Sequence, residues 1–361
     1  MLYNLLSPLA DDFQIFNLFR YLTFRTGGAI MTSLLICFLI GPRLILWLKA
    51  RQSGATNIRK YLEEAHAGKA GTPTMGGLMI LAAVSISTLL WADLTNHLVW
   101  IAMLVMVGYG AIGFADDYIK LTRKGSGGLP GRMKILFQTI IGVAATLWIM
   151  EVMPTPIHTH VAIPFFKHFF INLGWFFIPW VLFVLIGASN AVNLTDGLDG
   201  LAIVPVAIVA ASFGLIAYIV GRADFAAYLA IPFVPGTGEL AILCGALIGA
   251  SMGFLWYNAP PAAIFMGDTG SLAMGGVLAA IAVLTKHELV LAIIGGLFVM
   301  EAVSVILQVA SFKLTGKRMF AMAPIHHHFE KKGWSESTIV IRFWIIAMIL
   351  ALIGLSTLKL R

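Results

Sequence analysis

Long apolar stretches separated by short polar connections dominate the chain. Thr74–Ala92 contains no Asp, Glu, Lys or Arg, and neither does Ile171–Thr195. A helix needs about 20 mostly apolar residues to cross a lipid bilayer. The pattern therefore predicts about ten membrane-spanning helices, which are residues 24–48, 74–92, 97–115, 133–153, 174–193, 200–220, 239–257, 269–285, 289–312 and 338–358.

The predicted fold class is therefore an all-α polytopic membrane protein, with residues 1–361 forming a single integral membrane domain. The composition agrees, because 59% of the residues are hydrophobic and only 11% are charged, whereas soluble domains average about 25% charged residues. Soluble globular and disordered proteins are excluded as the leading classes. The segment Met153–Phe170, rich in Pro, His and Phe, is predicted to form a short external hairpin or loop.

The basic residues carry a topology signal. Ten crossings place both termini on one side, and 17 of the 24 Lys and Arg lie in or beside the five connections on the other side. Basic connections face the cytoplasm, so both termini are predicted to face outwards. The net charge is +7, but the basic residues are not clustered on one folded domain as nucleic acid binding requires. No nucleic acid partner is therefore expected.

Five of the 17 acidic residues lie where helices meet the predicted cytoplasmic connections. Ionisable groups at membrane depth are costly and suggest a functional site. Adjacent carboxylates on a helix point about 100° apart, so Asp116 and Asp117 are expected to have different roles, such as one at a metal and one at a nucleophile. A solvated helix end is the alternative. The other three acids at these junctions are Asp196, Asp199 and Asp268.

The connection at residues 190–201 is short, polar and contains two glycines. Glycines let the backbone approach a ligand closely, and a helix N-terminus offers N–H groups to an anion or a nucleobase. Asp196 or Asp199 could instead cap the following helix. One cap, however, does not require two Asn and two Asp in one turn.

Residues 258–270 form a connection shaped by Pro and Gly with one carboxylate, Asp268. This carboxylate is a candidate ligand, although a helix cap is the alternative. Phe265 could stack on a base or anchor the chain at the membrane interface. The string at residues 69–77 has two Thr flanked by Pro and Gly, which indicates either a shaped loop or a simple helix start.

Three consecutive histidines, His326–His328, lie in the longest basic connection. They cannot easily ligate one zinc ion, which prefers spaced ligands. Imidazoles beside phosphate or a substrate carboxylate fit better, and an incidental polar loop is the alternative.

Together these features place carboxylates, histidines and lysines on one side of a membrane domain. Mg²⁺ is commonly held by one or two carboxylates plus substrate phosphates, and such a site suits phosphoryl transfer. Walker A, HExxH and Rossmann motifs are absent from the sequence, which argues against an ATP-driven pump and a zinc protease.

Five strings across the chain resemble a known family: KAGTPTMGG (69–77), GFADDY (113–118), NAVNLTDGLDGLA (190–202), FMGDTGSLAMGG (265–276) and APIHHHFE (323–330). They are similar to phospho-N-acetylmuramoyl-pentapeptide transferases, the lipid I synthases of the polyprenyl-phosphate N-acetylhexosamine-1-phosphate transferase superfamily. The resemblance implies Mg²⁺-dependent transfer of phospho-MurNAc-pentapeptide from UDP-MurNAc-pentapeptide to undecaprenyl phosphate, giving lipid I and UMP. It also implies a multi-pass protein of the bacterial inner membrane, with periplasmic termini and a cytoplasmic active site.

The resemblance also implies roles for individual residues. Asp116 would deprotonate or orient the lipid phosphate, Asp268 would hold Mg²⁺, and Asp117 would support the metal and phosphates. Lys69, Lys120 and Lys134 would contact pyrophosphate or nucleotide, and His326, His327 and His328 would bind substrate near the phosphates. The implied nucleoside pocket consists of Asn193, Asp196, Gly197, Leu198, Asp199, Asn258 and Phe265. Thr74 and Gln308 are the other implied substrate-binding residues.

Several alternatives stay open. A related transferase acting on UDP-GlcNAc would share the aspartates, although the three histidines and TPTMGG favour the muramoyl substrate. A secondary transporter would need charges near the bilayer midplane and inverted repeats, which the sequence lacks. The sequence allows a homodimer without defining the oligomeric state. Glu301 could pair with a polar group in the bundle or break its helix to admit the lipid.

Overall fold

The computed structural model describes residues 1–52, 71–123, 127–166 and 169–359. Lys69, one of the predicted site residues, lies outside them. Two short strands occur, β1 (His160–Ala162) and β2 (Phe170–Asn172). The α-helices are α1 (Leu2–Leu6), α2 (Leu22–Gln52), α4 (Gly77–Trp91), α5 (His97–Thr122), α6 (Gly131–Val152), α7 (Phe177–Thr195), α8 (Ile203–Val220), α9 (Ala223–Leu229), α10 (Leu240–Asn258), α11 (Gly267–Leu284), α12 (Glu288–Ile294), α13 (Gly296–Thr315), α14 (Ile325–Lys331) and α15 (Glu336–Ser356).

The helices confirm an all-α polytopic membrane fold. Within the described residues, nine helices are long and apolar enough to cross a membrane: α2, α5, α6, α7, α8, α10, α11, α13 and α15. The predicted span 74–92 is the apolar helix α4, which has 15 residues. At 1.5 Å per residue α4 is about 22 Å long, shorter than the hydrocarbon core of about 30 Å.

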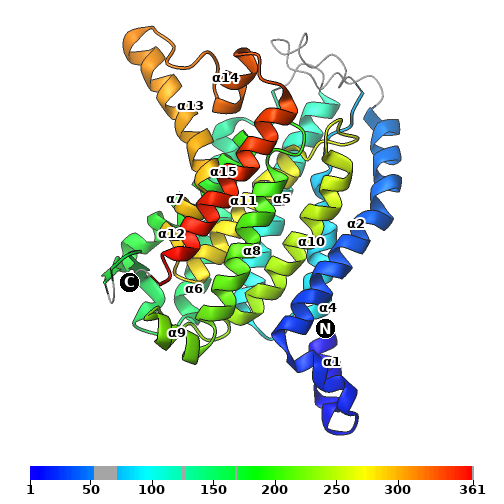
Figure 1. Cartoon of the computed structure of the whole chain (residues 1–361), viewed down its shortest axis with the longest axis vertical. Helices are drawn as coiled ribbons and strands as arrows, with labels where there is room; N and C mark the ends of the chain where they lie inside the picture. Colours follow the sequence, from blue (N-terminus) through cyan, green and yellow to red (C-terminus); the bar gives the residue numbers. More distant parts are fainter. Residues whose placement is uncertain (53–70, 124–126, 167–168, 360–361) are drawn as a thin grey trace.

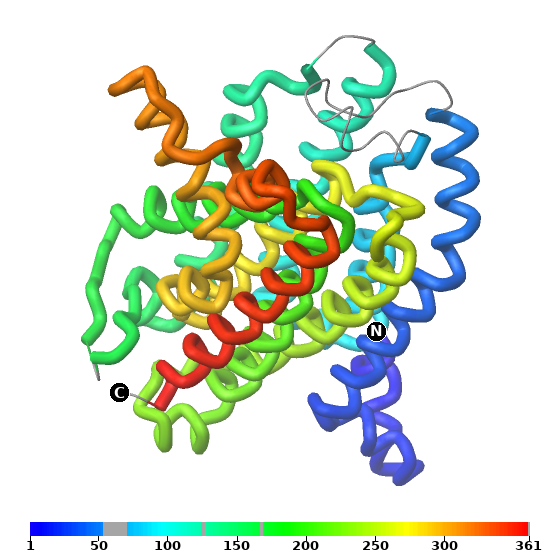
Figure 2. Tube along the Cα trace, turned by 45° about the horizontal axis from the view of Figure 1, so that its top comes forward, coloured from blue at the N-terminus to red at the C-terminus, as the bar shows by residue number. Residues whose placement is uncertain are grey.

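The predicted span 289–312 is wrong as one continuous helix. The structure divides it at Gly295 into α12 and α13. Gly295 and Gly296 are consecutive, and glycine both weakens a helix and favours a change of direction. Figures 1 and 2 show that the C-terminal part of α13, coloured orange, projects away from the other helices.

Helix α11 forms the centre of the bundle, and every residue from Thr269 to Leu284 is buried. It packs against α5 at very short range, because a Cβ added to Gly113 would lie 2.1 Å from the backbone oxygen of Asp268. Small residues allow helix backbones to approach this closely. The contact brings the amino end of α11 against the part of α5 that carries Asp116 and Asp117.

The hairpin predicted at residues 153–170 is present. β1 and β2 pair antiparallel, with His160 opposite Asn172. The second strand therefore continues two residues past the predicted end.

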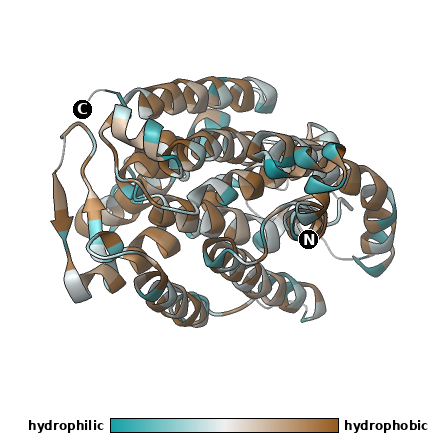
Figure 3. Ribbon diagram, turned by 90° about the horizontal axis from the view of Figure 1, so that it is seen from below, coloured by the Kyte–Doolittle hydropathy of each residue, from teal (hydrophilic) through white to brown (hydrophobic). Residues whose placement is uncertain are grey.

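Helix α1 and the C-terminal end of α15 lie in the lower half of Figure 1, whereas α14 lies at the top. Figure 3 shows that most of the helical ribbon is hydrophobic, as a lipid-embedded bundle requires. The side of the membrane that each end faces stays a prediction.

Candidate active site

Three carboxylates gather where α5 meets the amino end of α11. Asp116, Asp117 and Asp268 each offer one oxygen, and these oxygens lie within 4.8 Å of one another. Asp116 and Asp117 are buried, and the Asp268 side chain is 15% exposed. The sequence placed these three acids at one membrane face, and the structure brings them into one cluster.

Two lysines neutralise part of this negative charge. Lys120 Nζ lies 2.5 Å from Asp116 Oδ2 and 3.3 Å from Asp268 Oδ2. Lys134 Nζ lies 2.9 Å and 2.7 Å from the same two oxygens. The Leu129 backbone N–H also donates to Asp116 Oδ1 at 2.6 Å. Of the three predicted lysines, the structure describes Lys120 and Lys134, and both contact the carboxylates of this cluster directly.

Asp117 points at a different set of partners. Its carboxylate accepts hydrogen bonds from the backbone N–H groups of Asp268 (3.2 Å) and Thr269 (3.0 Å), and from the Thr269 hydroxyl at 2.7 Å. These backbone groups belong to the first turn of α11, whose N–H groups have no partner within the helix. Asp117 therefore caps α11 from α5, while Asp116 faces the lysines.

Asp268 is held by side chains rather than capping its own helix. Asn193 Nδ2 donates to Asp268 Oδ1 at 3.0 Å and to Ser271 Oγ at 2.7 Å. Ser271 in turn donates to the Gly267 carbonyl at 3.0 Å. The end of α7 and the start of α11 thus orient the Asp268 carboxylate.

The donor set fits a hard divalent cation. All three candidate ligands are carboxylates, and oxygen donors suit Mg²⁺ and Ca²⁺ rather than softer metals. The oxygens of Asp116, Asp117 and Asp268 are grouped closely enough to serve as ligands of one metal ion, and the two ammonium groups lie beside them.

The residues predicted for a nucleoside pocket hold two connections together. Asp199 Oδ2 accepts the Ala262 N–H at 3.0 Å, and Asn258 Oδ1 accepts the Gly200 N–H at 2.9 Å. The Asp199 N–H donates to Glu336 Oε1 at 2.8 Å. Asp199, Asn258 and Leu198 are buried, whereas Gly197 is exposed on the same turn.

Asp196 lies within electrostatic reach of the carboxylate cluster. Burial, followed by the charges of Asp268, Asp117 and Asp199, raises the pKa of Asp196 to about 8. The same negative charges that raise this pKa would attract a bound cation.

Thr74 and Phe265 lie beside the start of α11. A Cβ on Gly267 would lie 2.6 Å from Asp117 Oδ2 and 2.8 Å from Thr74 Oγ1, which places that hydroxyl at the cluster. The backbone of Phe265 pairs with two residues beside Thr74, because its N–H donates to the Pro73 carbonyl and its carbonyl accepts the Gly76 N–H, both at 2.8 Å.

The three histidines are held by other protein groups. His326 Nδ1 lies 3.1 Å from Glu301 Oε2, and His327 Nδ1 lies 2.5 Å from Glu330 Oε2. His328 Nδ1 accepts the Ala321 N–H at 3.1 Å. Of the two alternatives for Glu301, pairing is the one observed, since the helix break lies six residues earlier at Gly295.

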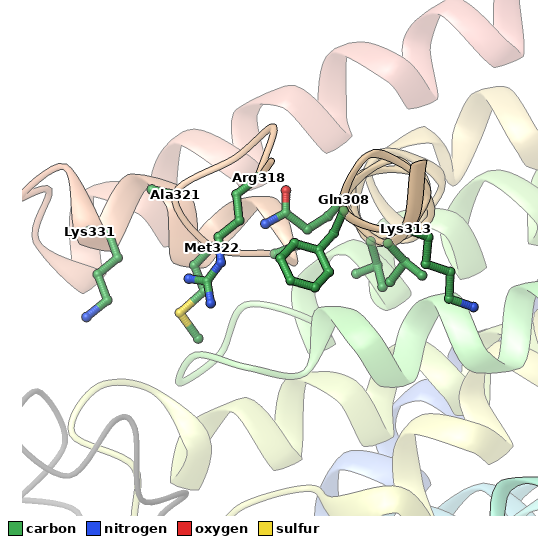
Figure 4. Close-up of a pocket in the computed structure, with 10 residues that line it drawn as sticks. Gln308, Lys313, Arg318, Ala321, Met322 and Lys331 are labelled. Carbon is green, nitrogen blue, oxygen red and sulfur yellow. The ribbon is translucent and has the colours of Figure 1, made fainter. Parts of the chain in front are cut away.

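Gln308 lines a separate cavity of about 660 Å³ between α13 and the loop that follows it (Figure 4). Its amide oxygen accepts the Phe320 N–H at 2.8 Å, and its amide nitrogen donates to the Phe320 carbonyl at 3.1 Å. Lys313, Arg318 and Lys331 add positive charge to this largely apolar cavity.

Some residues that shape the site were not predicted. Thr269, Ser271 and Glu336 contact predicted site residues directly. The first two follow Asp268 in the string GDTGS, so their proximity in sequence was a usable signal. Glu336 lies 137 residues from its partner Asp199, and no local pattern links the two.

Comparison with known proteins agrees with this geometry. Residues 98–286 match glycosyl transferase family 4, and residues 69–81 match signature 1 of phospho-N-acetylmuramoyl-pentapeptide-transferase. The chain is 60% identical to phospho-N-acetylmuramoyl-pentapeptide-transferases from Granulibacter bethesdensis and from Maricaulis maris, in each case over the full length of both proteins. The chain belongs to the phospho-N-acetylmuramoyl-pentapeptide transferase family.

Proposed function

We propose that the protein transfers phospho-MurNAc-pentapeptide from UDP-MurNAc-pentapeptide to undecaprenyl phosphate, which gives lipid I and UMP. The observation that carries this proposal is the cluster of Asp116, Asp117 and Asp268 with Lys120 and Lys134 in a chain that matches members of this family over their whole length. Phosphoryl transfer depends mainly on positioning and charge neutralisation, and this cluster supplies groups for both.

Asp116 is the candidate that deprotonates or orients the lipid phosphate. It faces two ammonium groups, whereas Asp117 is engaged at the start of α11. Lys120 and Lys134 can bind phosphate oxygens and so bring the lipid phosphate towards the diphosphate of the nucleotide-sugar. The difference in partners supports different roles for the two adjacent acids.

Mg²⁺ is the proposed cofactor, held by Asp268 with support from Asp117. The hydrogen bonds to Asp117 leave acceptor capacity on its oxygens, because an ionised carboxylate offers about four lone-pair sites. When bound, the ion would neutralise charge on the substrate phosphates. Asn193 and Lys134 hold the Asp268 carboxylate in place.

The nucleoside is proposed to lie against the 196–199 turn and the 258–265 connection. Gly197 and Leu198 would present backbone groups, and Phe265 would offer a ring for base stacking. Asp199 and Asn258 would act by holding the two connections together. The remaining proposed substrate contacts are Lys69, Thr74, Asn193, Asp196, Gln308, His326, His327 and His328.

The proposed setting is the bacterial inner membrane, with residues 1–361 as one catalytic domain, the carboxylate cluster on the cytoplasmic face and both termini in the periplasm. The distribution of Lys and Arg supports this orientation. A homodimer is compatible with the proposal.

The test is turnover by purified protein in detergent with UDP-MurNAc-pentapeptide, undecaprenyl phosphate and Mg²⁺. We expect UMP release that requires both substrates. Release from UDP-GlcNAc in place of the muramoyl substrate would assign the protein to the related GlcNAc-1-phosphate transferases. No UMP from either substrate would refute the proposed activity.

A further inference from the structure

Glu301 is a fully buried acid in the membrane-spanning helix α13. Its Oε2 contacts His326 Nδ1 at 3.1 Å, and its Oε1 has no hydrogen-bond partner among the described residues. A buried, half-satisfied carboxylate is expensive. An ionisable group at this depth is therefore a candidate for function, with His326 as the group through which it acts.

His326 lies at the start of α14 and is also fully buried. In the described part of the chain, the contact with Glu301 is the one hydrogen bond of its ring, because Nε2 has no partner. Glu301 is thus the polar group that orients this ring. A carboxylate beside one imidazole nitrogen commonly fixes the direction in which the other nitrogen points.

The far edge of the His326 ring rests on the 196–199 turn. A Cβ built on Gly197 would lie 2.3 Å from His326 Nε2 and 2.8 Å from its Cε1. The ring therefore fills the space in which any other residue at position 197 would place its side chain. Since α13 and α14 both contribute to this contact, the position of the turn depends on them.

We propose that Glu301 is a positioning residue, which holds the His326 ring against Gly197 and thereby sets the turn that receives the nucleoside of the substrate. This inference rests on the proposed function. Glu301 does not contact the carboxylate cluster in any described interaction, so its loss acts on nucleotide binding and leaves the transfer chemistry in place.

The experiment compares Glu301→Leu and Glu301→Gln with the wild-type protein in the UMP-release assay. Glu301→Leu removes the hydrogen-bond acceptor, and we expect KM for UDP-MurNAc-pentapeptide to rise at least tenfold. We expect kcat and KM for undecaprenyl phosphate to stay within threefold. Glu301→Gln keeps an acceptor oxygen for Nδ1–H and is expected to restore most of the nucleotide affinity.

Glu288→Leu is the matched control. Glu288 is a buried carboxylate beyond the opposite end of α11 from Asp268. We expect this control to lower thermal stability while KM for the nucleotide substrate stays within twofold. If Glu301→Leu lowers kcat and both affinities together, or if Glu301→Gln behaves like Glu301→Leu, the positioning role is wrong.

A second pair of variants approaches the contact from the other side. Gly197→Ala adds a Cβ against the ring, and we expect UMP to bind at least fivefold more weakly, as measured by calorimetry. In a His326→Ala background, both Gly197→Ala and Glu301→Leu should each change UMP affinity less than twofold. If either substitution weakens UMP binding in the His326→Ala background as much as it does alone, the inference is wrong. If the wild-type protein does not release UMP in the turnover assay, only the proposed activity is refuted.

Discussion

Lys134 Nζ lies 2.7 Å from Asp268 Oδ2 and so ties α6 to the first turn of α11. The same ammonium group lies 2.9 Å from Asp116 Oδ2. One lysine thus bridges two of the three clustered carboxylates. Such a charge-assisted contact keeps the two acids close in spite of their mutual repulsion.

Lys134→Gln should reduce kcat by about 10²-fold, the size expected when one preorganised electrostatic group is lost. The amide keeps a hydrogen-bond donor on a side chain that is one atom shorter, and it removes the positive charge beside Asp116 and Asp268. UMP release at saturating substrates measures the effect. Lys49→Gln, at an exposed lysine on α2, is the comparison for simple loss of a basic residue, and equal kcat values in the two variants would contradict this role.

Asp268→Asn should lower kcat by about 10²-fold or more, while the protein stays folded and inserted in the membrane. The amide keeps one acceptor oxygen in place of the two that accept from Asn193 and Lys134, so the expected loss combines the missing charge at the cation site with the loss of one of these hydrogen bonds. Mg²⁺ titrations of UMP release provide the measurement. A near-wild-type rate with an unchanged Mg²⁺ dependence would remove Asp268 from the metal site.

Much of this architecture follows from the sequence. Apolar stretches of spanning length lie where the helices are, and the acids at their ends gather at one site because the helices start or end at one membrane face. The break at Gly295 was not predicted, since apolar residues continue on both sides of it. A hydrophobic run specifies burial, and it does not specify whether the backbone keeps one direction.

Which neighbour each acid faces could not be predicted. Asp117 and Thr269 are 152 residues apart, and Asp199 and Glu336 are 137 apart. Their contacts depend on how α5, α11 and α15 pack, and a single sequence carries no direct record of that packing. The same holds for Glu301, whose partner His326 lies beyond the end of its helix.

Gly113→Ala should disrupt the cluster from a distance. The new Cβ would lie 2.1 Å from the Asp268 backbone oxygen, so α5 and α11 must separate, at a cost of about 1–3 kcal/mol in unfolding free energy. Gly187→Ala is the matched control, because a Cβ there meets nothing within 4 Å. The thermal unfolding temperature and kcat should both fall in Gly113→Ala and not in Gly187→Ala. Equal values in the two variants would contradict the close contact between α5 and α11.

Thr269→Val tests the cap that Asp117 provides. It removes the hydroxyl that lies 2.7 Å from Asp117 Oδ2 while the backbone N–H groups remain. We expect a loss of about 1 kcal/mol in unfolding free energy and a fall in kcat of about tenfold, because small displacements of catalytic groups are costly. Thr269→Ser keeps the hydroxyl and should behave like wild type, so similar losses in both variants would show that the hydroxyl does not account for the effect.

Asp199→Ala should weaken UMP binding by about tenfold, the effect of about 1.4 kcal/mol. The Asp199 carboxylate accepts the Ala262 N–H at 3.0 Å, and its loss leaves that partly buried backbone group without this acceptor. The 258–265 connection, including Phe265, would then be less firmly held beside the 196–199 turn. Asp199→Asn retains an oxygen for Ala262 and should bind UMP within threefold of wild type. An unchanged dissociation constant in Asp199→Ala would show that the nucleoside does not depend on this link, whereas equal losses in both variants would indicate that the charge itself is required.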